Sequence, residues 1–467
     1  MTTACKPLIQ RGSSDPIAFI YKPLQCLGEL TGIVSAEQFL AHVQSLAGQL
    51  PKGKGQHVIN LCGNRYLFMV SICAAILREQ ISLLPPNKSQ GTQQTLASRY
   101  DNVYVLHDGT SVHEGLTHLD VAGLDLSAKP GNKDSNKAYA NKHYATDIPL
   151  QQLALISFTS GSTGESKPNL KTWETLMVST QINRRFMFPD EQIYYLLATV
   201  PGQHMWGLET SVLMALFSPL CVVDTKPLFP KDIELQLNTL PEPRALVSAP
   251  VHLRAMMEES IDYPAISAIL CATSPLSSEL AQTVERRFSG TLREVYGCSE
   301  VGSMSVRRTA ETDVWRRFDG IEMQKNEQSS IEVYADHLPE IITLQDKLEF
   351  INANQFRLVG RENDMIDIAG KRGSLAEINR LLANFSGISD GVVIFPQQNR
   401  PVPRLIAIVA LKTGFSSENL RDYFQTHLDA AFIPRPILCV DELPREESGK
   451  LSAKRINSLY QQLTSKE

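Results

Sequence analysis

Residues Leu153 to Pro168 read LALISFTSGSTGESKP and decide the fold of the chain. Leu153 to Phe158 is a mostly apolar run, which predicts a buried β-strand. The run leads into a loop of small residues and one lysine, Thr159-Ser160-Gly161-Ser162-Thr163-Gly164-Glu165-Ser166-Lys167-Pro168. Small residues let backbone N–H groups converge on an anion, hydroxyls add donors, and a lysine adds positive charge. The stretch therefore predicts a phosphate-binding loop that follows a strand of an α/β sheet and precedes a helix.

Two other interpretations of this loop are open. One is a flexible surface linker, but a linker seldom places several hydroxyls, glycines and a lysine directly after an apolar strand. The other is the P-loop of kinases and ATPases, which requires the pattern GxxxxGK[ST]. Here Gly161 is followed at that spacing by Ser166, and Lys167 precedes a proline. The glycine spacing therefore disfavours a P-loop.

The patterns around the loop indicate a parallel α/β sheet. His57 to Leu61 predicts a strand, Leu67 to Leu77 predicts an apolar helix, and a second short strand ends at Leu84. Further short buried strands are expected at residues 103–106, 245–248, 268–272 and 292–296. Residues 127–145, rich in Ser, Asn, Lys and Gly, predict an exposed loop.

After Gly360 the chain changes to short alternating elements. Strands are expected at residues 365–368, 391–395 and 405–411, and helices at 375–384 and 417–428. About a hundred residues is the usual size of a separate domain. The predicted fold class is α/β, with a large N-terminal domain of parallel and mixed sheets with helices over residues 1–361. A small α+β domain follows over residues 362–467.

The loop closely resembles TSGSTGxPK, the signature of the adenylate-forming superfamily. This superfamily holds acyl-CoA and aryl-CoA synthetases, luciferases, acyl-carrier-protein ligases and adenylation domains of nonribosomal peptide synthetases. Three further segments resemble its motifs PxxHxxG, YGxTE and LPxxxxGK in the same order: Pro201-Gly202-Gln203-His204-Met205-Trp206-Gly207, Tyr296-Gly297-Cys298-Ser299-Glu300 and Leu443-Pro444-Arg445-Glu446-Glu447-Ser448-Gly449-Lys450. The resemblance spans roughly residues 55 to 460, and on it the chain is identified as a member of the superfamily.

The resemblance implies a site for ATP and Mg²⁺. The phosphate-binding residues would be Thr159, Ser160, Gly161, Ser162 and Gly164, with Thr163 and Lys167 as catalytic residues of the same loop. Around the nucleoside, Tyr296 would stack on adenine beside Gly297, Ser299 would face the α-phosphate, Asp346 would accept hydrogen bonds from the ribose, and Arg361 would add a charged contact. Glu300 would hold magnesium, because Mg²⁺ prefers one or two carboxylates together with phosphate oxygens.

The small domain would be mobile and would carry the catalytic Lys450. By the resemblance, Lys450 bridges the substrate carboxylate and the α-phosphate and stabilises the charge that develops in the transition state. Asn363 stands where the family has its hinge, and asparagine tolerates unusual backbone angles. The small domain would then rotate about Asn363 between two half-reactions.

The chain departs from the family pattern at several places, including a short stretch between Gly320 and Asp346. It has Leu344-Gln345 before Asp346 where the family has Thr-Gly, and Ala272-Thr273-Ser274-Pro275-Leu276 where the family has GGAPL. These changes predict a divergent branch. The expected substrate pocket is lined by His204, Trp206, Ser248, Val251, Cys271 and Ser274. With no charge to bind an α-amino group, this lining favours an aromatic acid, such as a hydroxybenzoate, over an amino acid.

Composition limits the compartment and the partners. The net charge of −5 gives no general attraction for nucleic acid, and no apolar run approaches the roughly 20 residues that span a bilayer. Met1 to Ser13 is polar, without the apolar core of a signal peptide, so a cytoplasmic location is expected. The eight cysteines are scattered and are expected to be reduced, and the histidines show no metal-binding spacing.

We therefore expect an ATP-dependent ligase that activates a carboxylic acid as its acyl-adenylate. The acyl group would pass to the phosphopantetheine thiol of CoA or of an acyl carrier protein. The chain has no attachment serine of its own, so a carrier would act in trans. The alternatives are a ligase for medium- or long-chain fatty acids, a non-catalytic nucleotide-binding homologue, and a P-loop phosphotransferase that would release ADP.

Overall fold

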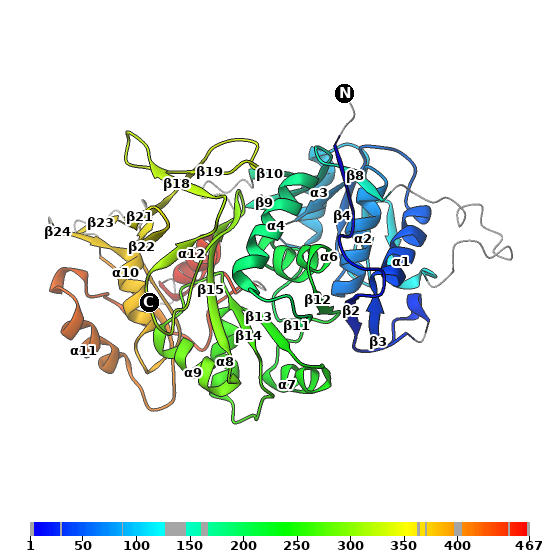
Figure 1. Cartoon of the computed structure of the whole chain (residues 1–467). Helices are drawn as coiled ribbons and strands as arrows, with labels where there is room; N and C mark the ends of the chain where they lie inside the picture. Colours follow the sequence, from blue (N-terminus) through cyan, green and yellow to red (C-terminus); the bar gives the residue numbers. More distant parts are fainter. Residues whose placement is uncertain are drawn as a thin grey trace, which may run out of the picture.

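The computed structural model describes residues 4–28, 30–85, 87–126, 146–159, 167–361, 365–368, 371–396, 404–446 and 449–464. In these ranges no helix has both the length and the apolar character to cross a membrane. Figure 1 shows the early part of the chain, in blue, at one end of the molecule, with the green middle part beside it and the yellow and orange parts at the other end. The predicted exposed loop at 127–145 and the predicted domain junction at 362–364 lie outside the described residues.

The first sheet of the large domain has six strands in the order β10-β9-β5-β4-β6-β7. They are β4 (His57–Asn60), β5 (Ile81–Leu84), β6 (Val103–His107), β7 (His118–Asp120), β9 (Leu153–Thr159) and β10 (Lys167–Thr172). Every neighbouring pair is parallel except β9 with β10. The helix α2 (Arg65–Leu77) connects β4 to β5 and is buried along its whole length, while α3 (Gln90–Arg99) connects β5 to β6. The predicted strand–helix–strand unit is confirmed.

One local prediction is wrong. The phosphate-binding loop was expected to lead into a helix, but it leads into β10, which pairs antiparallel with β9 in a hairpin. The helix α4 (Trp173–Met187) begins only after β10, with the Thr172 side chain accepting a hydrogen bond from Thr175 N. Polar and apolar residues alternate too weakly in Lys167–Thr172 to predict a strand. Pairing with the buried strand β9 gives this segment its extended conformation.

The second sheet has eleven strands in the order β21-β22-β17-β16-β15-β14-β13-β11-β12-β2-β3. The six strands from β2 to β15 in this order are mutually parallel, and the pairs beyond them on either side are antiparallel. The strands are β2 (Pro16–Ile20), β3 (Gly32–Ser35), β11 (Tyr194–Ala198), β12 (Leu220–Val223), β13 (Arg244–Ser248), β14 (Ala268–Cys271), β15 (Thr291–Cys298), β16 (Gly302–Arg307), β17 (Trp315–Arg317), β21 (Asp346–Asn352) and β22 (Gln355–Arg361).

Alternate residues of the central strands enter two different cores, as the period of two along a strand requires. Leu246 and Ile269 pack with α7 (Pro230–Thr239), α8 (Pro250–Glu258) and α9 (Ser278–Phe288). Their neighbours Val247 and Leu270 face the other way, into the large core shared with α2 and α4. Both faces of this sheet are therefore covered, which explains why its strands are short continuous apolar runs.

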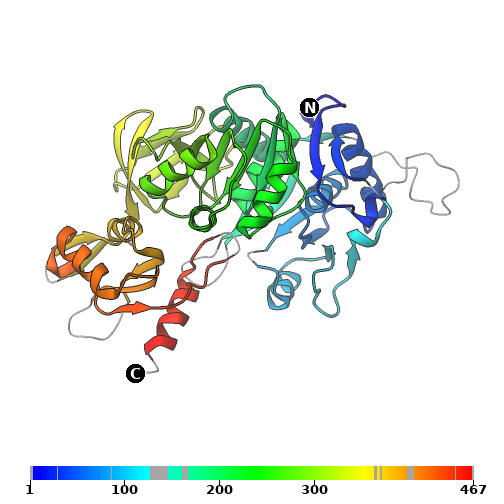
Figure 2. The same ribbon diagram turned by 90° about the horizontal axis from the view of Figure 1, so that it is seen from below.

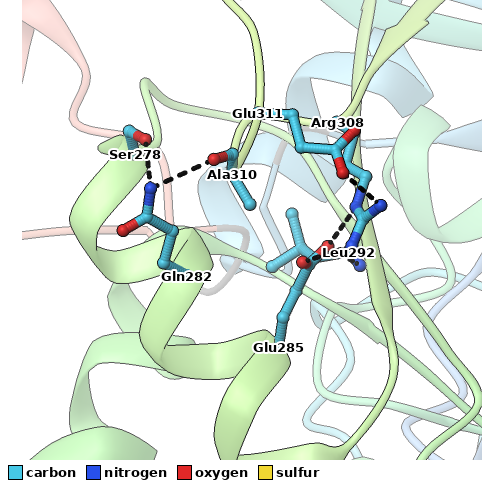
Figure 3. Close-up of polar contacts among 7 residues, drawn as sticks. All are labelled: Ser278, Gln282, Glu285, Leu292, Arg308, Ala310 and Glu311. Carbon is cyan, nitrogen blue, oxygen red and sulfur yellow. Dashed lines mark hydrogen bonds and ion pairs between the residues drawn. The ribbon is translucent and has the colours of Figure 1, made fainter.

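The helix α9 is fixed to the strand loops beside it by polar contacts (Figure 3). Glu285 accepts a hydrogen bond from Leu292 N at 2.8 Å and forms an ion pair with Arg308 at 2.9 Å. Arg308 also contacts Glu311, and Gln282 donates to Ala310 O at 3.1 Å. These contacts hold the start of β15 and the end of β16 against one helix, which orients the hairpin between them.

Smaller elements complete the large domain. They are α1 (Ala36–Gln49), α5 (Met205–Leu208), the π-helical turn η3 (Glu209–Leu213), α6 (Met214–Phe217), the 3₁₀ turns η1 (Gln25–Leu27) and η2 (Val121–Gly123), the pair β1 (Cys5–Pro7) and β8 (Asp147–Pro149), and the sheet β18 (Glu322–Lys325), β19 (Ile331–Tyr334) and β20 (Ile342–Leu344). Ser35 caps α1 in a capping box with Gln38.

The small C-terminal domain has its own apolar core, formed by residues such as Ile378, Leu382 and Phe424. Its elements are β23 (Met365–Ile368), β24 (Lys371–Ser374), α10 (Leu375–Ala383), β25 (Ile388–Ile394), β26 (Ile406–Leu411), α11 (Ser417–His427), the 3₁₀ turn η5 (Ala430–Phe432), β27 (Ile437–Cys439) and α12 (Ala453–Thr464). Of these, β23, α10, β25, β26 and α11 match the predicted strands and helices within about three residues, whereas β24, η5, β27 and α12 were not predicted. Figure 2 shows this domain, in orange, beside the large domain, and the red segment before α12 returning toward the green part. The predicted α/β fold with a small second domain is confirmed.

Candidate active site

The predicted phosphate-binding loop closes the β9–β10 hairpin. Thr159 and Lys167 are cross-strand partners at the loop end of this hairpin, so the two ends of the loop are adjacent. The loop residues Ser160, Gly161, Ser162, Thr163 and Gly164 lie outside the described residues, and so do the side chains of Thr159 and Lys167. The predicted phosphate contacts of this loop stay predictions.

Tyr296 and Asp346, predicted to hold the adenine and the ribose, lie together. The Tyr296 hydroxyl donates to an Asp346 carboxylate oxygen at 2.9 Å. The Tyr296 ring also packs beside Trp315 and Phe356, with ring centroids 5.7 and 6.0 Å away. Asp346 is the cross-strand partner of Arg361, whose side chain lies outside the described part. Three predicted nucleoside residues are thus brought to one place by strands far apart in sequence.

The turn that carries Ser299 and Glu300 connects β15 to β16 and is fixed by two buried charged residues. The Lys171 ammonium, on β10, donates to the carbonyl oxygen of Glu300. The Glu209 carboxylate accepts hydrogen bonds from Ser303 N at 3.1 Å and from Ser303 Oγ at 2.7 Å. Burial raises the pKa of Glu209 and lowers the pKa of Lys171, and each opposes the other's shift because their charges are opposite.

The donor set fits a magnesium ion bound mainly by its substrate. The described residues contain no group of three His, Cys, Asp or Glu side chains that could enclose a metal. Glu300 supplies a single half-exposed carboxylate at the turn. Mg²⁺ is usually bound by one or two carboxylates, substrate phosphates and water, so Glu300 would hold it against the phosphates of ATP.

The segment around His204 is shaped by a close backbone approach. A Cβ atom on Gly207 would lie 2.0 Å from Pro201 O, so only glycine fits there. Trp206 donates from Nε1 to Ser248 O at 3.3 Å, which connects two predicted pocket residues. His204 precedes the first residue of α5 and is half-buried. The structure thus places His204, Trp206 and Ser248 in one neighbourhood.

The carboxyl ends of β13 and β14 hold the other predicted pocket residues. Val251 is the second residue of α8, which follows β13, and is half-buried. Ser274, after β14, is also half-buried. Cys271 differs, because its side chain is fully buried in the core beneath α8 and α9. Burial raises the pKa of Cys271 well above its usual range and that of Cys298 to about 12, so both are thiols at neutral pH.

Thr273 occupies the position where the family has glycine and has a φ of +89°. A β-branched residue in this region is strained. Its hydroxyl is buried and has no hydrogen-bond partner. The lost glycine noted in the sequence therefore leaves a strained turn at the edge of the predicted pocket.

Lys450 belongs to a loop of the small domain that contacts the large domain. A Cβ atom on Gly449 would lie 3.1 Å from side-chain atoms of both Ala249 and Val251. The loop is fixed from its own side, because Arg445 donates to the Asp390 carboxylate at 2.7 and 2.6 Å and to Gly449 O at 2.8 Å. The Lys450 side chain is exposed. Lys450 is thus brought next to the carboxyl end of β13.

Comparison with known proteins identifies the family. The model of the family described as "AMP-binding enzyme" matches residues 12–323, which is more than half of the chain. The chain belongs to the AMP-binding enzyme family. This confirms the predicted membership and the prediction of an AMP-forming ligase.

The relatives of this AMP-binding enzyme are named for different carboxylic acid substrates. A putative long chain fatty acid-CoA ligase VraA of Staphylococcus haemolyticus is 24% identical over 68% of this chain and 73% of its own. The 3,4-dihydroxybenzoate–[aryl-carrier protein] ligase of Bacillus anthracis is 22% identical over 77% of this chain and 85% of its own.

Two solved structures share the fold. The o-succinylbenzoate CoA synthetase of Bacillus subtilis, in complex with its acyl-adenylate intermediate, has a TM-score of 0.77 and 18% identity, covering 91% of this chain and 93% of its own. The anthranilate CoA ligase AuaEII with anthranoyl-AMP has a TM-score of 0.75 and 13% identity, covering 96% and 95%.

Nothing in the sequence indicated that several further polar residues lie beside the predicted substrate pocket. Thr199 Oγ1 lies 2.9 Å from both Ser248 Oγ and His252 Nδ1, beside the predicted pocket. Burial lowers the pKa of His252 to about 4, so its imidazole is neutral at pH 7. No spacing in the sequence connects Thr199 with His252, because parallel pairing of β11 with β13 brings them together.

A small pocket of about 80 Å³ beside Pro201–Gln203 was also missed. Three basic side chains line it, those of Arg65, Lys88 and Lys226. Arg65 is buried and donates to Ala198 O at 3.0 Å. The three residues follow β4, β5 and β12, so only the sheet order reveals that they share one cavity. The one signal in the sequence for this pocket was the presence of a basic residue shortly after each of three short apolar strands.

Proposed function

We propose that this AMP-binding enzyme joins a carboxylic acid to the AMP part of ATP and then transfers the acyl group to a phosphopantetheine thiol. One observation carries the proposal. The parallel strands β13, β14 and β15 end at a common edge, where the Gly449–Lys450 loop meets Ala249 and Thr273. Tyr296 lies near the end of β15, and Glu300 follows that strand. The residues predicted to act as the catalytic cation, the magnesium-binding carboxylate and the nucleoside contacts therefore lie at the edge where parallel strands usually bind ligands, which supports the proposal.

In the first half-reaction, a carboxylate oxygen of the acid would attack the α-phosphorus of ATP, and pyrophosphate would leave. Tyr296 and Asp346 orient the nucleoside, and Ser299 faces the α-phosphate. Lys450 stabilises the charge that develops between the two substrates. Mg²⁺ held at Glu300 supplies charge neutralisation of the phosphates. No protein nucleophile is required, since positioning and charge account for the rate.

In the second half-reaction, the sulfur of the acceptor would attack the acyl carbon, the thiol proton would be lost to solvent, and AMP would leave. We propose that the small domain, residues 362–467, rotates about Asn363 to remove Lys450 and admit the thiol. The contacts between the domains suit such a motion. They include a hydrogen bond from Arg254 to Ile388 O at 3.2 Å and a partly exposed ion pair of Lys412 with Glu258 at 3.7 Å.

An aromatic acid is the proposed substrate. Trp206 and Val251 give the pocket apolar surface, and the relatives named for dihydroxybenzoate, o-succinylbenzoate and anthranilate act on aromatic acids. The relative named for long-chain fatty acids supports the alternative of a fatty acid. An acyl carrier protein is the favoured acceptor over CoA.

The test is pyrophosphate release from Mg·ATP with a panel of benzoates, straight-chain fatty acids and amino acids. Release with benzoates alone supports an aryl acid ligase, and release with fatty acids alone selects the alternative. The active acid is then incubated with CoA or with phosphopantetheinylated carrier protein, and thioester is detected by mass spectrometry. ATP binding without release for any acid would indicate a non-catalytic homologue, and release of ADP would contradict the proposal.

A further inference from the structure

The buried residues Lys171 and Glu209 come from two segments that meet at the turn between β15 and β16. Lys171 lies on β10, the strand that leaves the phosphate-binding loop, and its side chain is 2% exposed. Glu209 begins the π-helical turn η3, directly after the His204 segment, and is also 2% exposed. Burying charged groups costs free energy unless their hydrogen bonds and opposite charges compensate. Two such groups at one turn therefore require an explanation.

Both residues bind the turn. Lys171 donates to Glu300 O on one side of the turn. On the other side, Glu209 accepts from the backbone N–H and the hydroxyl of Ser303, at 3.1 and 2.7 Å. The residues between these two anchors, Val301 and Gly302, are buried. The backbone of the turn is therefore fixed from both ends.

Gly302 shows that the fit of Glu209 is close. Its φ is +99°, and a Cβ atom there would lie 2.2 Å from the Glu209 Oε1 atom. The carboxylate of Glu209 thus fills the space that any side chain at residue 302 would need. π-helical turns inside α-helices often occur at functional sites, and this one begins at the carboxylate that contacts the turn.

We propose that Lys171 and Glu209 are positioning residues that couple the phosphate-binding hairpin and the His204 helix to the turn of Glu300, and so set the geometry in which Glu300 binds Mg·ATP. The inference rests on the proposed function, since it assigns magnesium to Glu300. Lys171 lies on the strand that leaves the loop expected to bind the phosphates, and Glu209 lies in the helical segment beside the predicted acid pocket. The coupling therefore aligns three parts of one site.

The Arg307–Glu294 ion pair provides a matched control on the same hairpin. Glu294 lies on β15 and Arg307 on β16, at the end of the hairpin away from the Glu300 turn. Their side chains are 2.7 Å apart and largely buried. Replacing Arg307 with methionine should perturb the hairpin in a comparable way without moving the turn.

The experiment measures ATP binding by titration calorimetry, with Mg²⁺ and with EDTA, for wild type, Lys171→Met, Glu209→Leu, Glu209→Gln and Arg307→Met. We expect Lys171→Met and Glu209→Leu to weaken Mg·ATP binding about 10- to 100-fold, the factor for losing a hydrogen bond to a charged group. Binding with EDTA should change much less. Glu209→Gln keeps an oxygen for Ser303 and should largely restore binding, and Arg307→Met should lower the melting temperature alone.

The inference is overturned if the affinities measured with Mg²⁺ and with EDTA fall equally, or if Arg307→Met reproduces the loss. If Lys171→Met fails to fold, the double variant Lys171→Met/Glu209→Met removes both buried charges, and a folded double variant with normal Mg·ATP affinity also overturns it. The titration needs no acid, so it tests the inference independently of pyrophosphate release. Normal magnesium-dependent binding in a wild type that releases no pyrophosphate would instead count against the proposed function.

Discussion

Replacing Lys450 with alanine should abolish acid activation while leaving the protein folded. The Lys450 side chain is exposed, and the loop is held by the Arg445 contacts with Asp390 and with Gly449 O, so its loss should change stability by no more than about 0.5 kcal/mol. A unit charge about 4 Å from charge developing in the transition state contributes about 4 kcal/mol at an effective dielectric constant of about 20. Removing one such stabilising group usually costs about 100- to 1,000-fold in rate.

The assay is the single-turnover rate of pyrophosphate release with the best acid of the panel, with the melting temperature measured in parallel. Lys454→Ala is the matched control. Lys454 is also an exposed lysine, and it lies at the start of α12, four residues after Lys450. Chemically prepared acyl-adenylate should be converted to thioester by Lys450→Ala at nearly the wild-type rate. The reasoning is refuted if Lys450→Ala keeps a third or more of the pyrophosphate release, or if Lys454→Ala loses as much.

Three further outcomes are expected. Tyr296→Phe removes the hydroxyl that donates to Asp346 and should weaken ATP binding about 3- to 10-fold by calorimetry, while unchanged affinity would contradict the role of that bond. Thr273→Gly should raise the free energy of unfolding by about 1 kcal/mol in urea, because it relieves the φ of +89°, and a loss of stability would contradict the strain. Burial lowers the pKa of His42 and His252 to about 4, so the unfolded chain binds more protons between pH 6.5 and 4. Stability should therefore fall on acidification through this window, by about 1.4 kcal/mol per pH unit for each imidazole, and His42→Gln should reduce the slope measured in urea.

The sequence predicted the parallel strands β4, β5, β6, β9, β13, β14 and β15, most of which are continuous buried runs, but it did not predict the parallel strands β2, β7, β11 and β12. Runs such as Ala245 to Ser248 and Ala268 to Cys271 have no polar alternation, and α2 is apolar all round. The β10 strand was missed because Lys167–Thr172 is mostly polar and gains its conformation from pairing with β9. The local pattern of apolar residues predicts a strand when those residues are also buried. It fails for a strand such as β10, whose conformation depends on pairing with a neighbouring strand.

The candidate site was predicted where function depends on contiguous residues and missed where it depends on the sheet order. Tyr296, Glu300 and Lys450 belong to short motifs that are visible in the chain. Lys171 and Glu209 belong to no such motif, and their roles depend on a turn that is distant in sequence. A charged residue inside the apolar run Leu208–Phe217 was the only local signal, since a buried glutamate requires a partner.

The central claim is that an oxygen of the carboxylic acid becomes bonded to the α-phosphorus of ATP. It is tested most directly by one full turnover with an ¹⁸O-labelled acid, Mg·ATP and the thiol acceptor, followed by mass spectrometry of the nucleotide. We expect the nucleotide product to be AMP that carries one ¹⁸O atom, and pyrophosphate to carry none. Unlabelled AMP, or ADP together with labelled inorganic phosphate, would contradict it.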